Sequence, residues 1–259
     1  MPWRNRKQNG NNWESPLIAR LRTFVDLSAG DIEELRTLME SDLATPRRRD
    51  LVVDGYEYRK LAFVNEGYAA RYKLLRNGKR QIINVIVPGD IIGLPSSFLD
   101  LPTFSVIALT DMKMDVCALE TFVEFCYRRS KFALALSWLA VQEATTYAEH
   151  IVDIGRRTSV ERLAHFLLEM HARLSTVGMA DGNVFDLPIS QEVISDALGL
   201  SVPHLNRMIA KLRADRMIAI AERRVELLDP QGLRMLAHFQ PGRLSRIPSP
   251  FKRLTESAS

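Results

Sequence analysis

The stretch that decides the fold is residues 187–212, LPISQEVISDALGLSVPHLNRMIAKL. Its pattern predicts two short helices joined by a turn at Gly199, because apolar residues recur at helical spacing on both sides of that glycine. Ser190 and Ser201 each stand where a hydroxyl can cap the helix that follows. The inward residues of the second helix are Leu205, Ile209 and Leu212. This pattern is typical of a helix-turn-helix, whose second helix presents its N-terminal side chains to the major groove of DNA.

The residues that follow this hairpin predict a wing. Residues 217–220 and 225–228 are short β-prone runs on either side of the polar turn Glu222-Arg223-Arg224. Helical hairpins that bind nothing are common, and this flanking pattern strengthens the interpretation as a winged helix-turn-helix. Arg223 and Arg224 at the tip would lie near DNA phosphates, although a solvated turn predicts the same residues.

The positive charge of the chain lies in the same part as the hairpin. The chain has 35 Lys and Arg against 31 Asp and Glu, a net charge of +4. Residues 1–155 hold 20 of each sign, so the whole excess falls in residues 156–259, where 15 basic residues face 11 acidic ones. This distribution favours phosphate binding, but the excess is too small to indicate nucleic-acid binding by itself.

Length and composition predict two compact domains in a cytoplasmic protein. The chain has 259 residues, of which 46% are hydrophobic, and no apolar run approaches the ~20 residues that span a bilayer. We expect residues 1–20 to form a flexible arm rather than a signal peptide, and the Pro- and Ser-rich residues 240–259 to be a disordered tail. Cys117 and Cys126 are too few for a disulfide framework. We expect buried structural thiols there, and a redox-tuned thiol is the alternative.

Residues 21–128 predict an antiparallel β-roll within an α+β fold. An amphipathic helix is expected at residues 31–39, and from Arg48 onward short β-prone runs alternate with turn signals. Asn77-Gly78 is the strongest short hairpin signal in the chain. A roll of this size holds one small ligand or is filled by its own side chains.

Residues 129–157 predict a long helix that ends in a hinge at Gly155, followed by the winged helix-turn-helix domain at residues 158–239. Two stripes compete along this helix. One consists of Leu136, Leu139, Glu143, Thr146, His150 and Asp153 and becomes polar beyond Leu139. The more apolar one consists of Trp138, Val141, Thr145, Ala148, Ile151, Val152 and Gly155. This pattern favours a dimerisation helix that buries one stripe on its own roll and the other on a partner. The alternative is a helix that only closes the domain core.

This order of elements resembles the Crp/Fnr family of bacterial transcription regulators over roughly residues 21–237. The resemblance rests on VPGDIIG at residues 87–93, Arg162-Leu163-Ala164 after the hinge, and residues 187–216. The segments EGYAARYKLL (66–75) and LGLSVPHLNR (198–207) look like one proteobacterial branch. The resemblance implies a homodimer that reads a palindrome on double-stranded DNA, with RNA polymerase as a further partner.

The effector pocket departs from the cyclic-nucleotide pattern of that family. Cyclic-nucleotide-binding members have a Gly-Glu pair, and an Arg followed by Ser or Thr eleven residues after the Gly. Here Gly93 is followed by Leu94, and the later pair is Phe104-Ser105. Tyr147 falls near the expected adenine contacts. Without the arginine, the bidentate charge that holds a cyclic phosphate is missing, so we expect a degenerate pocket with an unknown effector or none.

We expect no metal and no cofactor. The oxygen-sensing branch needs four cysteines, mostly near the N-terminus, and this chain has none before Cys117. A haem would need an axial ligand, and the roll contains no histidine. His150 on the long helix is the only one near the pocket, and we interpret it as a hydrogen-bonded interface residue.

The resemblance also assigns the DNA contacts. Arg207 matches the recognition arginine and is suited to guanine O6 and N7, while Pro203 stands where members usually carry a cytosine- or adenine-reading Glu. The expected base-reading residues are Val202, Pro203, Asn206 and Arg207. The expected backbone contacts are Ser190, Gln191, Ser201, His204, Lys211, Arg223 and Arg224.

Two other classes of function are weighed against a DNA-binding regulator. An enzyme is disfavoured, because the roll offers only scattered acids and no histidine. A cyclic-nucleotide-type module that regulates by protein contact is the alternative, and the Leu94 and Phe104 departures oppose it. Specific retention on DNA or tight cyclic-nucleotide binding would discriminate the two.

Overall fold

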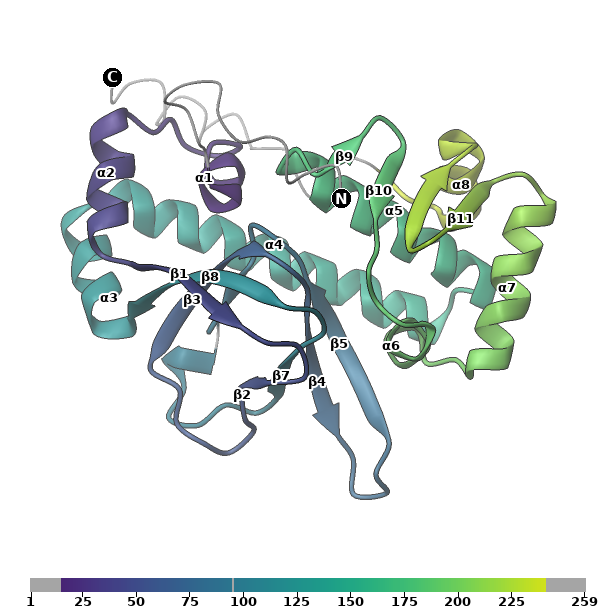
Figure 1. The fold of residues 1–259 in the computed structure, drawn as a ribbon, viewed down its shortest axis with the longest axis horizontal. Helices are drawn as coiled ribbons and strands as arrows, with labels where there is room; N and C mark the ends of the chain where they lie inside the picture. Colours follow the sequence, from purple (N-terminus) through teal and green to yellow (C-terminus); the bar gives the residue numbers. More distant parts are fainter. Residues whose placement is uncertain (1–14, 95, 241–259) are drawn as a thin grey trace.

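The computed structural model describes residues 15–94 and 96–240. Its N-terminal part is built from strands with helices on one side, and its C-terminal part is mainly helical (Figure 1). The N-terminal elements are α1 (Pro16–Leu21), α2 (Ala29–Thr37), β1 (Glu40–Thr45), β2 (Asp50–Val52), β3 (Lys60–Glu66), β4 (Ala69–Leu74), β5 (Arg80–Ile86), β6 (Ile91–Ile92), η2 (Ser96–Phe98), β7 (Ser105–Ala108), β8 (Met112–Ala118) and α3 (Leu119–Arg128).

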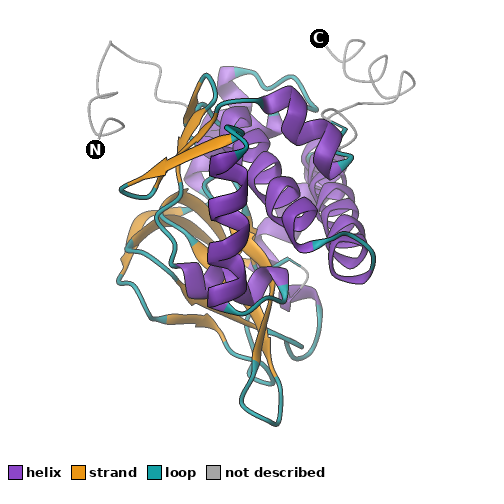
Figure 2. Cartoon of the chain, turned by 90° about the vertical axis from the view of Figure 1, so that its right-hand side faces the viewer, coloured by secondary structure: helices purple, strands orange, loops and turns teal. Residues whose placement is uncertain are grey.

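The long helix α4 (Ser130–Gly155) links this part to the C-terminal domain. The elements of that domain are α5 (Ser159–Thr176), β9 (Ala180–Asp181), β10 (Val184–Asp186), α6 (Gln191–Leu198), α7 (Val202–Ala214), β11 (Ile218–Ala221), β12 (Arg224–Leu227) and α8 (Pro230–Ala237). The predicted β-roll, long helix and winged helix-turn-helix are therefore confirmed. Figure 2 shows the helices gathered beside the strands of the roll.

Two four-stranded antiparallel sheets form the roll, in the orders β1-β8-β3-β6 and β2-β7-β4-β5. Apolar side chains from both sheets, such as Val64, Ile86 and Val106, fill the space between them. The β4–β5 hairpin turns at Asn77-Gly78 as predicted, because Gly78 supplies a φ of 79° and the Asn77 side chain accepts from the Lys79 amide at 3.0 Å.

The N-terminal boundary differs from the prediction. Residues 16–20, expected in a flexible arm, belong to α1, whose Leu17 and Ile18 are buried. Ser15 caps this helix and Pro16 occupies its first turn, which is a favoured combination at a helix start.

The helix expected at residues 31–39 begins earlier, at Ala29, because Ser28 and Asp31 form a capping box. Residues 1–14 and the expected tail at 241–259 lie outside the described residues.

The C-terminal domain shares a hydrophobic core with the outer face of the roll. Ala70, Ile82 and Val85 from β4 and β5 belong to the same buried cluster as Leu163 and Leu167 of α5. Successive strand residues point to opposite faces, so Ala69 enters the roll core while Ala70 faces the C-terminal domain. The two domains are therefore packed directly against each other rather than joined by α4 alone.

Candidate nucleic-acid interface and effector pocket

The hairpin of α6 and α7 is held by two of the residues that predict it, Ser190 and Gly199, whereas the cap expected from the Ser201 hydroxyl is not formed. The Ser190 hydroxyl accepts from the Val193 amide at 3.3 Å, and Gly199 ends α6 with a φ of 64°. The Leu200 amide then donates to the Ser195 carbonyl at 2.9 Å, which satisfies the end of the helix. The inward residues Leu205, Ile209 and Leu212 of α7 are buried. Their packing fixes which face of α7 points outward.

The outward face of α7 carries the expected base-reading residues. Pro203, Asn206 and Arg207 are exposed and Val202 is half-buried at the first turn of the helix. Asn206 and Arg207 are adjacent in sequence and lie one turn beyond Val202 and Pro203, so the four share the N-terminal half of one surface. The structure thus brings these four side chains together on a solvent-facing helix end.

The expected backbone contacts lie on three segments, which are the start of α6, the helix α7 and the wing. Gln191 opens α6 and is exposed, and Ser201 is exposed at the N-cap of α7, where its hydroxyl makes no capping hydrogen bond. His204 is half-buried, whereas Lys211 is exposed and lies 3.5 Å from the Asp215 carboxylate. Ser190 is also exposed, although its hydroxyl already caps α6.

The wing tip is held beside the entry to α6. Glu222 and Arg223 form the turn with φ values of 47° and 69°, and Arg224 begins β12 rather than belonging to the turn. The Arg223 carbonyl accepts from the Leu187 amide at 2.7 Å. The exposed Arg223 and Arg224 are therefore anchored next to the segment that leads into the hairpin.

One arginine joins the hinge to the hairpin turn. The Arg162 Nε donates to the Arg157 carbonyl at 3.0 Å, and its Nη1 donates to the Leu198 carbonyl at 3.1 Å. Arg157 lies between α4 and α5, and Leu198 is the last residue of α6. A guanidinium with several donors in a fixed plane can satisfy both carbonyls at once. These two hydrogen bonds explain why the motif Arg162-Leu163-Ala164 begins with an arginine.

The hairpin also contacts the roll through Asp196 of α6. The Arg80 guanidinium donates to the Asp196 carboxylate at 2.9 Å and 2.6 Å, and the Gln81 side-chain amide donates to the Asp196 carbonyl at 2.9 Å. A third link is the Tyr68 hydroxyl, which donates to the Asp186 carbonyl at 2.8 Å. These contacts orient the helix-turn-helix relative to β4 and β5. Sequence reasoning missed them because each joins residues more than 100 positions apart.

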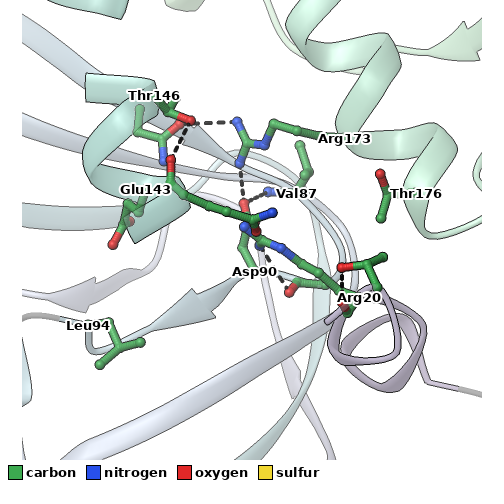
Figure 3. A network of polar contacts seen from close by, with 12 residues as sticks. Arg20, Val87, Asp90, Leu94, Glu143, Thr146, Arg173 and Thr176 are labelled. Carbon is green, nitrogen blue, oxygen red and sulfur yellow. Dashed lines mark hydrogen bonds and ion pairs between the residues drawn. The ribbon is translucent and has the colours of Figure 1, made fainter. Parts of the chain in front are cut away.

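Asp90, in the VPGD turn, joins three elements. Its carboxylate pairs with Arg20 of α1 and with Arg173 of α5, and it accepts from the Val87 amide at 2.9 Å. Figure 3 shows Arg20 and Arg173 reaching Asp90 from opposite sides. Because the three side chains are largely buried, these pairs are screened less by salt than surface pairs. Asp90 therefore fixes both α1 and the C-terminal domain to the roll.

The network continues from Arg173 to the long helix. Arg173 donates to Glu169 at 2.9 Å, and Glu169 lies 2.6 Å from Nε2 of His150, whose Nδ1 is 3.0 Å from the Ile83 carbonyl. Burial lowers the pKa of His150, but Glu169, the Ile83 carbonyl and Asp153 outweigh it, so the pKa is raised. Burial raises the pKa of Glu169, but His150 and Arg173 bring it down to about 2. His150 is thus a hydrogen-bonded interface histidine.

The residues expected to line an effector pocket lie between the roll and α4, where Arg71 of β4 contacts three of them. The Nη2 of Arg71 donates to the Leu94 carbonyl at 2.7 Å, and the guanidinium carbon lies 4.7 Å from the Phe104 ring centroid and 5.8 Å from that of Tyr147. Arg71 also pairs with Glu143 of α4. Three expected pocket residues, Leu94, Phe104 and Tyr147, are therefore gathered around one arginine.

The other two expected pocket residues have structural roles. Gly93 has a φ of 113°, and a Cβ there would lie 2.4 Å from the Lys60 carbonyl oxygen, so only glycine fits. The Ser105 hydroxyl accepts from the Asp54 amide at 3.0 Å. The residues present do not fit a cyclic nucleotide, because no arginine stands at position 104 and an internal ion pair fills the space.

Arg71 and Glu143 are the pocket residues that sequence reasoning missed. Arg71 stands in the quoted segment 66–75, where a charged residue in a strand is expected to face solvent. Glu143 stands in the polar stripe of the long helix. An acid in the inward stripe of a helix is the one signal that could have indicated a buried basic partner.

One face of α4 is buried against the rest of the chain, and the opposite face is exposed. The polar stripe faces inward, where Leu139, Thr146 and Asp153 are buried. The outward face is apolar and consists of Leu134, Ser137, Val141, Ala144, Ala148, Ile151 and Gly155, all exposed. Trp138, expected on the apolar stripe, instead stacks on Phe24 with ring centroids 5.1 Å apart. We call these seven outward residues the α4 seam.

The two cysteines form no disulfide in the structure. Cys117 is buried and Cys126 is half-buried, and both are free. Burial raises the pKa of Cys117, and burial together with Cys117 raises the pKa of Cys126 to about 11. Neither is a thiolate at neutral pH, which favours the structural interpretation.

No helix in the described residues combines the length and apolarity needed to cross a membrane. Within the same residues, no group of three or more His, Cys, Asp or Glu side chains is placed to hold a metal ion.

Both domains match models of known protein families. A Crp-like helix-turn-helix domain model matches residues 161–236, and a cyclic nucleotide-binding domain model matches residues 46–129. The nitrogen fixation regulation protein FixK of Bradyrhizobium diazoefficiens is 34% identical over 67% of this chain and 72% of its own length. The transcriptional activatory protein AadR of Rhodopseudomonas palustris is 31% identical over 66% of this chain and 71% of its own length.

A solved structure has the same arrangement. The structure of FixK2 from Bradyrhizobium japonicum superposes with a TM-score of 0.69 at 25% identity, and the match covers 76% of this chain and 96% of FixK2.

Proposed function

Because the chain belongs to the Crp/Fnr family of transcription regulators, we propose that it regulates transcription as a homodimer bound to a palindromic DNA site. Family members are regulators and not enzymes. The observation that carries the proposal is the exposed N-terminal half of α7, where Arg207 and Asn206 face solvent beside Val202. A two-fold dimer would place two such helices on half-sites about one helical turn apart.

The side chains of α7 suggest how a half-site is read. Arg207 would donate to guanine O6 and N7, Val202 would contact a thymine methyl group, and Asn206 would pair with adenine or a phosphate. We therefore expect a TTG-like core. Pro203 has no acceptor to offer, so discrimination is relaxed where the family usually carries Glu. The backbone contacts would come from Ser190, Gln191, Ser201, His204, Lys211, Arg223 and Arg224.

The α4 seam supports dimerisation. Its residues follow a three-four spacing over the whole helix, which is the repeat of a two-stranded coiled coil. Val141 and Ile151 remain 56% and 73% exposed in the single chain, an unusual arrangement for branched apolar residues aligned on one face. The small Ala144 and Ala148 would let two helices approach closely. A second copy of α4 would cover this surface.

A signal would pass from the roll to DNA through a physical route that the packing suggests. It would run from the pocket to α4, from α4 through the hinge after Gly155 to α5, and from there to the spacing of the α7 helices. At promoters the dimer would contact RNA polymerase, and its site of action would be the bacterial cytoplasm.

The test is the affinity of purified protein for a selected palindrome and for scrambled DNA of equal length at one salt concentration. Arg207→Ala should weaken specific binding by about 1–3 kcal/mol and leave non-specific binding unchanged, because a base contact is lost while phosphate contacts remain. Arg234→Ala is the matched control, since Arg234 is an exposed arginine on α8. An equal loss on both DNAs would make Arg207 a phosphate contact and contradict the assignment.

A further inference from the structure

Arg71 contacts three of the residues expected to line an effector pocket, namely Leu94, Phe104 and Tyr147. The Arg71 side chain is 1% exposed although it carries a full charge. Its guanidinium pairs with Glu143, donates to the Leu94 carbonyl at 2.7 Å and lies over the Phe104 ring. It combines a charge-assisted hydrogen bond with a cation–π contact, and both are stronger when desolvated than in water.

These contacts come from separate parts of the fold. Arg71 belongs to β4, Leu94 follows β6, Phe104 precedes β7, and Glu143 and Tyr147 lie on α4. The Tyr147 hydroxyl donates to the Glu143 carboxylate at 2.8 Å, so the acid is held on both sides. The guanidinium is therefore the group that connects the roll to the long helix at this point.

Stability alone does not explain a charge in this position. A buried ion pair is costly to desolvate, and an apolar pair of similar volume is often as stable or more so. Burial raises the pKa of Glu143, and Arg71 opposes that rise. Without Arg71, an unpaired carboxylate would face a desolvated pocket. The pair is better suited to fixing one relative position of roll and helix than to adding net stability.

We propose that Arg71 is a built-in ligand, whose guanidinium occupies the effector pocket and fixes α4 against the roll so that specific DNA binding needs no diffusible effector. The proposal rests on the proposed function for its DNA readout. It also assigns the pocket a chemical preference. Once the Arg71 side chain is shortened, the pocket is a site for a small alkylguanidinium ion paired with Glu143.

Chemical rescue tests this directly. In Arg71→Ala, specific DNA affinity should fall by roughly 5- to 150-fold, the usual range of coupling between two sites. Millimolar ethylguanidinium should restore most of the loss and raise the thermal midpoint of the variant, while N-ethylurea, a neutral compound of similar shape, does neither. Ionic strength is held constant with NaCl. Arg59→Ala, which removes an exposed arginine of the roll paired with Glu57, should bind DNA as the intact protein does.

The outcomes separate this inference from the proposed function. If Arg71→Ala binds DNA as tightly as the intact protein, or if ethylguanidinium neither restores binding nor stabilises the folded variant, the inference is wrong and the regulator remains. If the intact protein shows no specific DNA binding without an added ligand, the inference is wrong, because it requires binding without a diffusible effector. The proposed function fails only if Arg207→Ala and the intact protein bind the selected palindrome and scrambled DNA alike under every ligand condition tested. If ethylguanidinium nevertheless stabilises Arg71→Ala and not the intact protein, it binds in the space that the Arg71 guanidinium occupies in the intact protein.

A measurement on the intact protein covers the case in which Arg71→Ala does not fold. Cyclic AMP and cyclic GMP at millimolar concentration should change neither its thermal midpoint nor its specific DNA affinity, because Arg71 already fills their place. An increase of either quantity would overturn the inference, since the pocket would have to be open.

Discussion

Pro203 is the residue that most distinguishes the exposed end of α7 from a typical reading helix of the family. It is exposed in the first turn, where a proline is tolerated because its missing N–H has no partner within the helix. The cost is a lost hydrogen-bond acceptor at a position that we propose faces DNA. Arg207 and Asn206 remain one turn further on, so the helix keeps its donors and loses one means of discrimination.

Replacing this proline should therefore narrow the DNA preference. Pro203→Glu places a carboxylate that accepts from a cytosine or adenine amino group and also favours the N-terminal end of a helix. We expect discrimination of about 1–3 kcal/mol at one base pair that the parent protein reads weakly. Competition binding against the four base pairs at each half-site position measures this. Pro203→Leu, which introduces a side chain without a hydrogen-bond acceptor, is the control, and an unchanged preference in the Glu variant would show that position 203 does not face a base.

Residue-level prediction succeeded where the signal was local. The caps at Ser190 and Gly199 and the exposed arginine of α7 follow from spacing within a dozen residues. Arg71 could not be placed in the same way, because its partners Leu94, Phe104 and Glu143 lie up to 72 positions away. A charged residue in a strand is normally expected to face solvent. Arg71 is buried only because the closed roll brings partners from other elements around it.

Among the elements, α4 shows most clearly how one helix serves two surfaces. Its inward stripe carries Glu143 and His150 into polar contacts with the roll and α5, and its outward α4 seam is apolar. A stripe that becomes polar is normally expected to face solvent. Here it faces inward because every charge on it finds a partner.

A charge in the α4 seam should separate the dimer. Ile151→Glu would place two carboxylates opposite each other in a two-fold seam, where both the burial and the repulsion are unfavourable. We expect monomers at concentrations at which the parent protein is dimeric, and a loss of specific DNA binding. Tyr127→Glu on α3 is the matched control, because Tyr127 is 92% exposed but lies outside the seam. Sedimentation equilibrium measures both variants, and a dimeric Ile151→Glu would contradict the seam.

Helices and strands could be predicted where a turn residue or a regular spacing of apolar residues indicated them. The β4–β5 hairpin follows from Asn77-Gly78, and the wing follows from two short runs around a polar turn. Helix α1 was missed although Ser15-Pro16 is a start signal, because its six residues are too few to show a period. It is stabilised by tertiary contacts, which are the burial of Leu17, Ile18 and Leu21 in the core and the pair of Arg20 with Asp90.

At the scale of the whole molecule, partly buried ion pairs and hydrogen bonds connect the domains. Asp90 links α1, the roll and α5, and Asp196 links α6 to β5 through Arg80 and Gln81. No sequence period indicates such contacts, since they join domains that are each predicted separately. The relative placement of the C-terminal domain is accordingly the part of the fold that the sequence left open.

Removing the central charge should weaken the whole assembly. Asp90→Asn leaves Arg20 and Arg173 without their shared counter-charge and should lower the free energy of unfolding by about 1–3 kcal/mol. Asp54→Asn breaks the Asp54–Lys73 pair, which is 41% and 44% exposed, and should cost no more than about 1 kcal/mol. Urea unfolding of both variants measures the contrast. Equal effects would mean that Asp90 is only another surface acid.

The His150–Glu169 pair predicts a pH dependence of stability. The pKa of His150 is raised above its ordinary 6.5, so its contribution is complete below pH 6.5 and is lost as the pH rises through the folded value. The pKa of Glu169 is lowered from 4.5 to about 2, so its contribution is present above pH 4.5 and is lost as the pH falls towards 2. The pair therefore stabilises most between pH 4.5 and 6.5.

A histidine variant tests this window. His150→Gln should lower the free energy of unfolding most between pH 4.5 and 6.5, and its difference from the parent protein should shrink at higher pH. Urea unfolding across this range at constant ionic strength gives both curves. A difference that stays constant with pH would show that protonation of His150 does not contribute.

The central claim is that this chain is a dimeric, sequence-specific DNA-binding regulator that is competent without an added ligand. Selection of binding sites from a random DNA library by the purified, effector-free protein, at a stated salt concentration, tests it most directly. We predict a palindromic consensus with TTG-like half-sites centred about one helical turn apart. Recovery of sequences without any consensus, from a protein that is folded and dimeric, would contradict the claim.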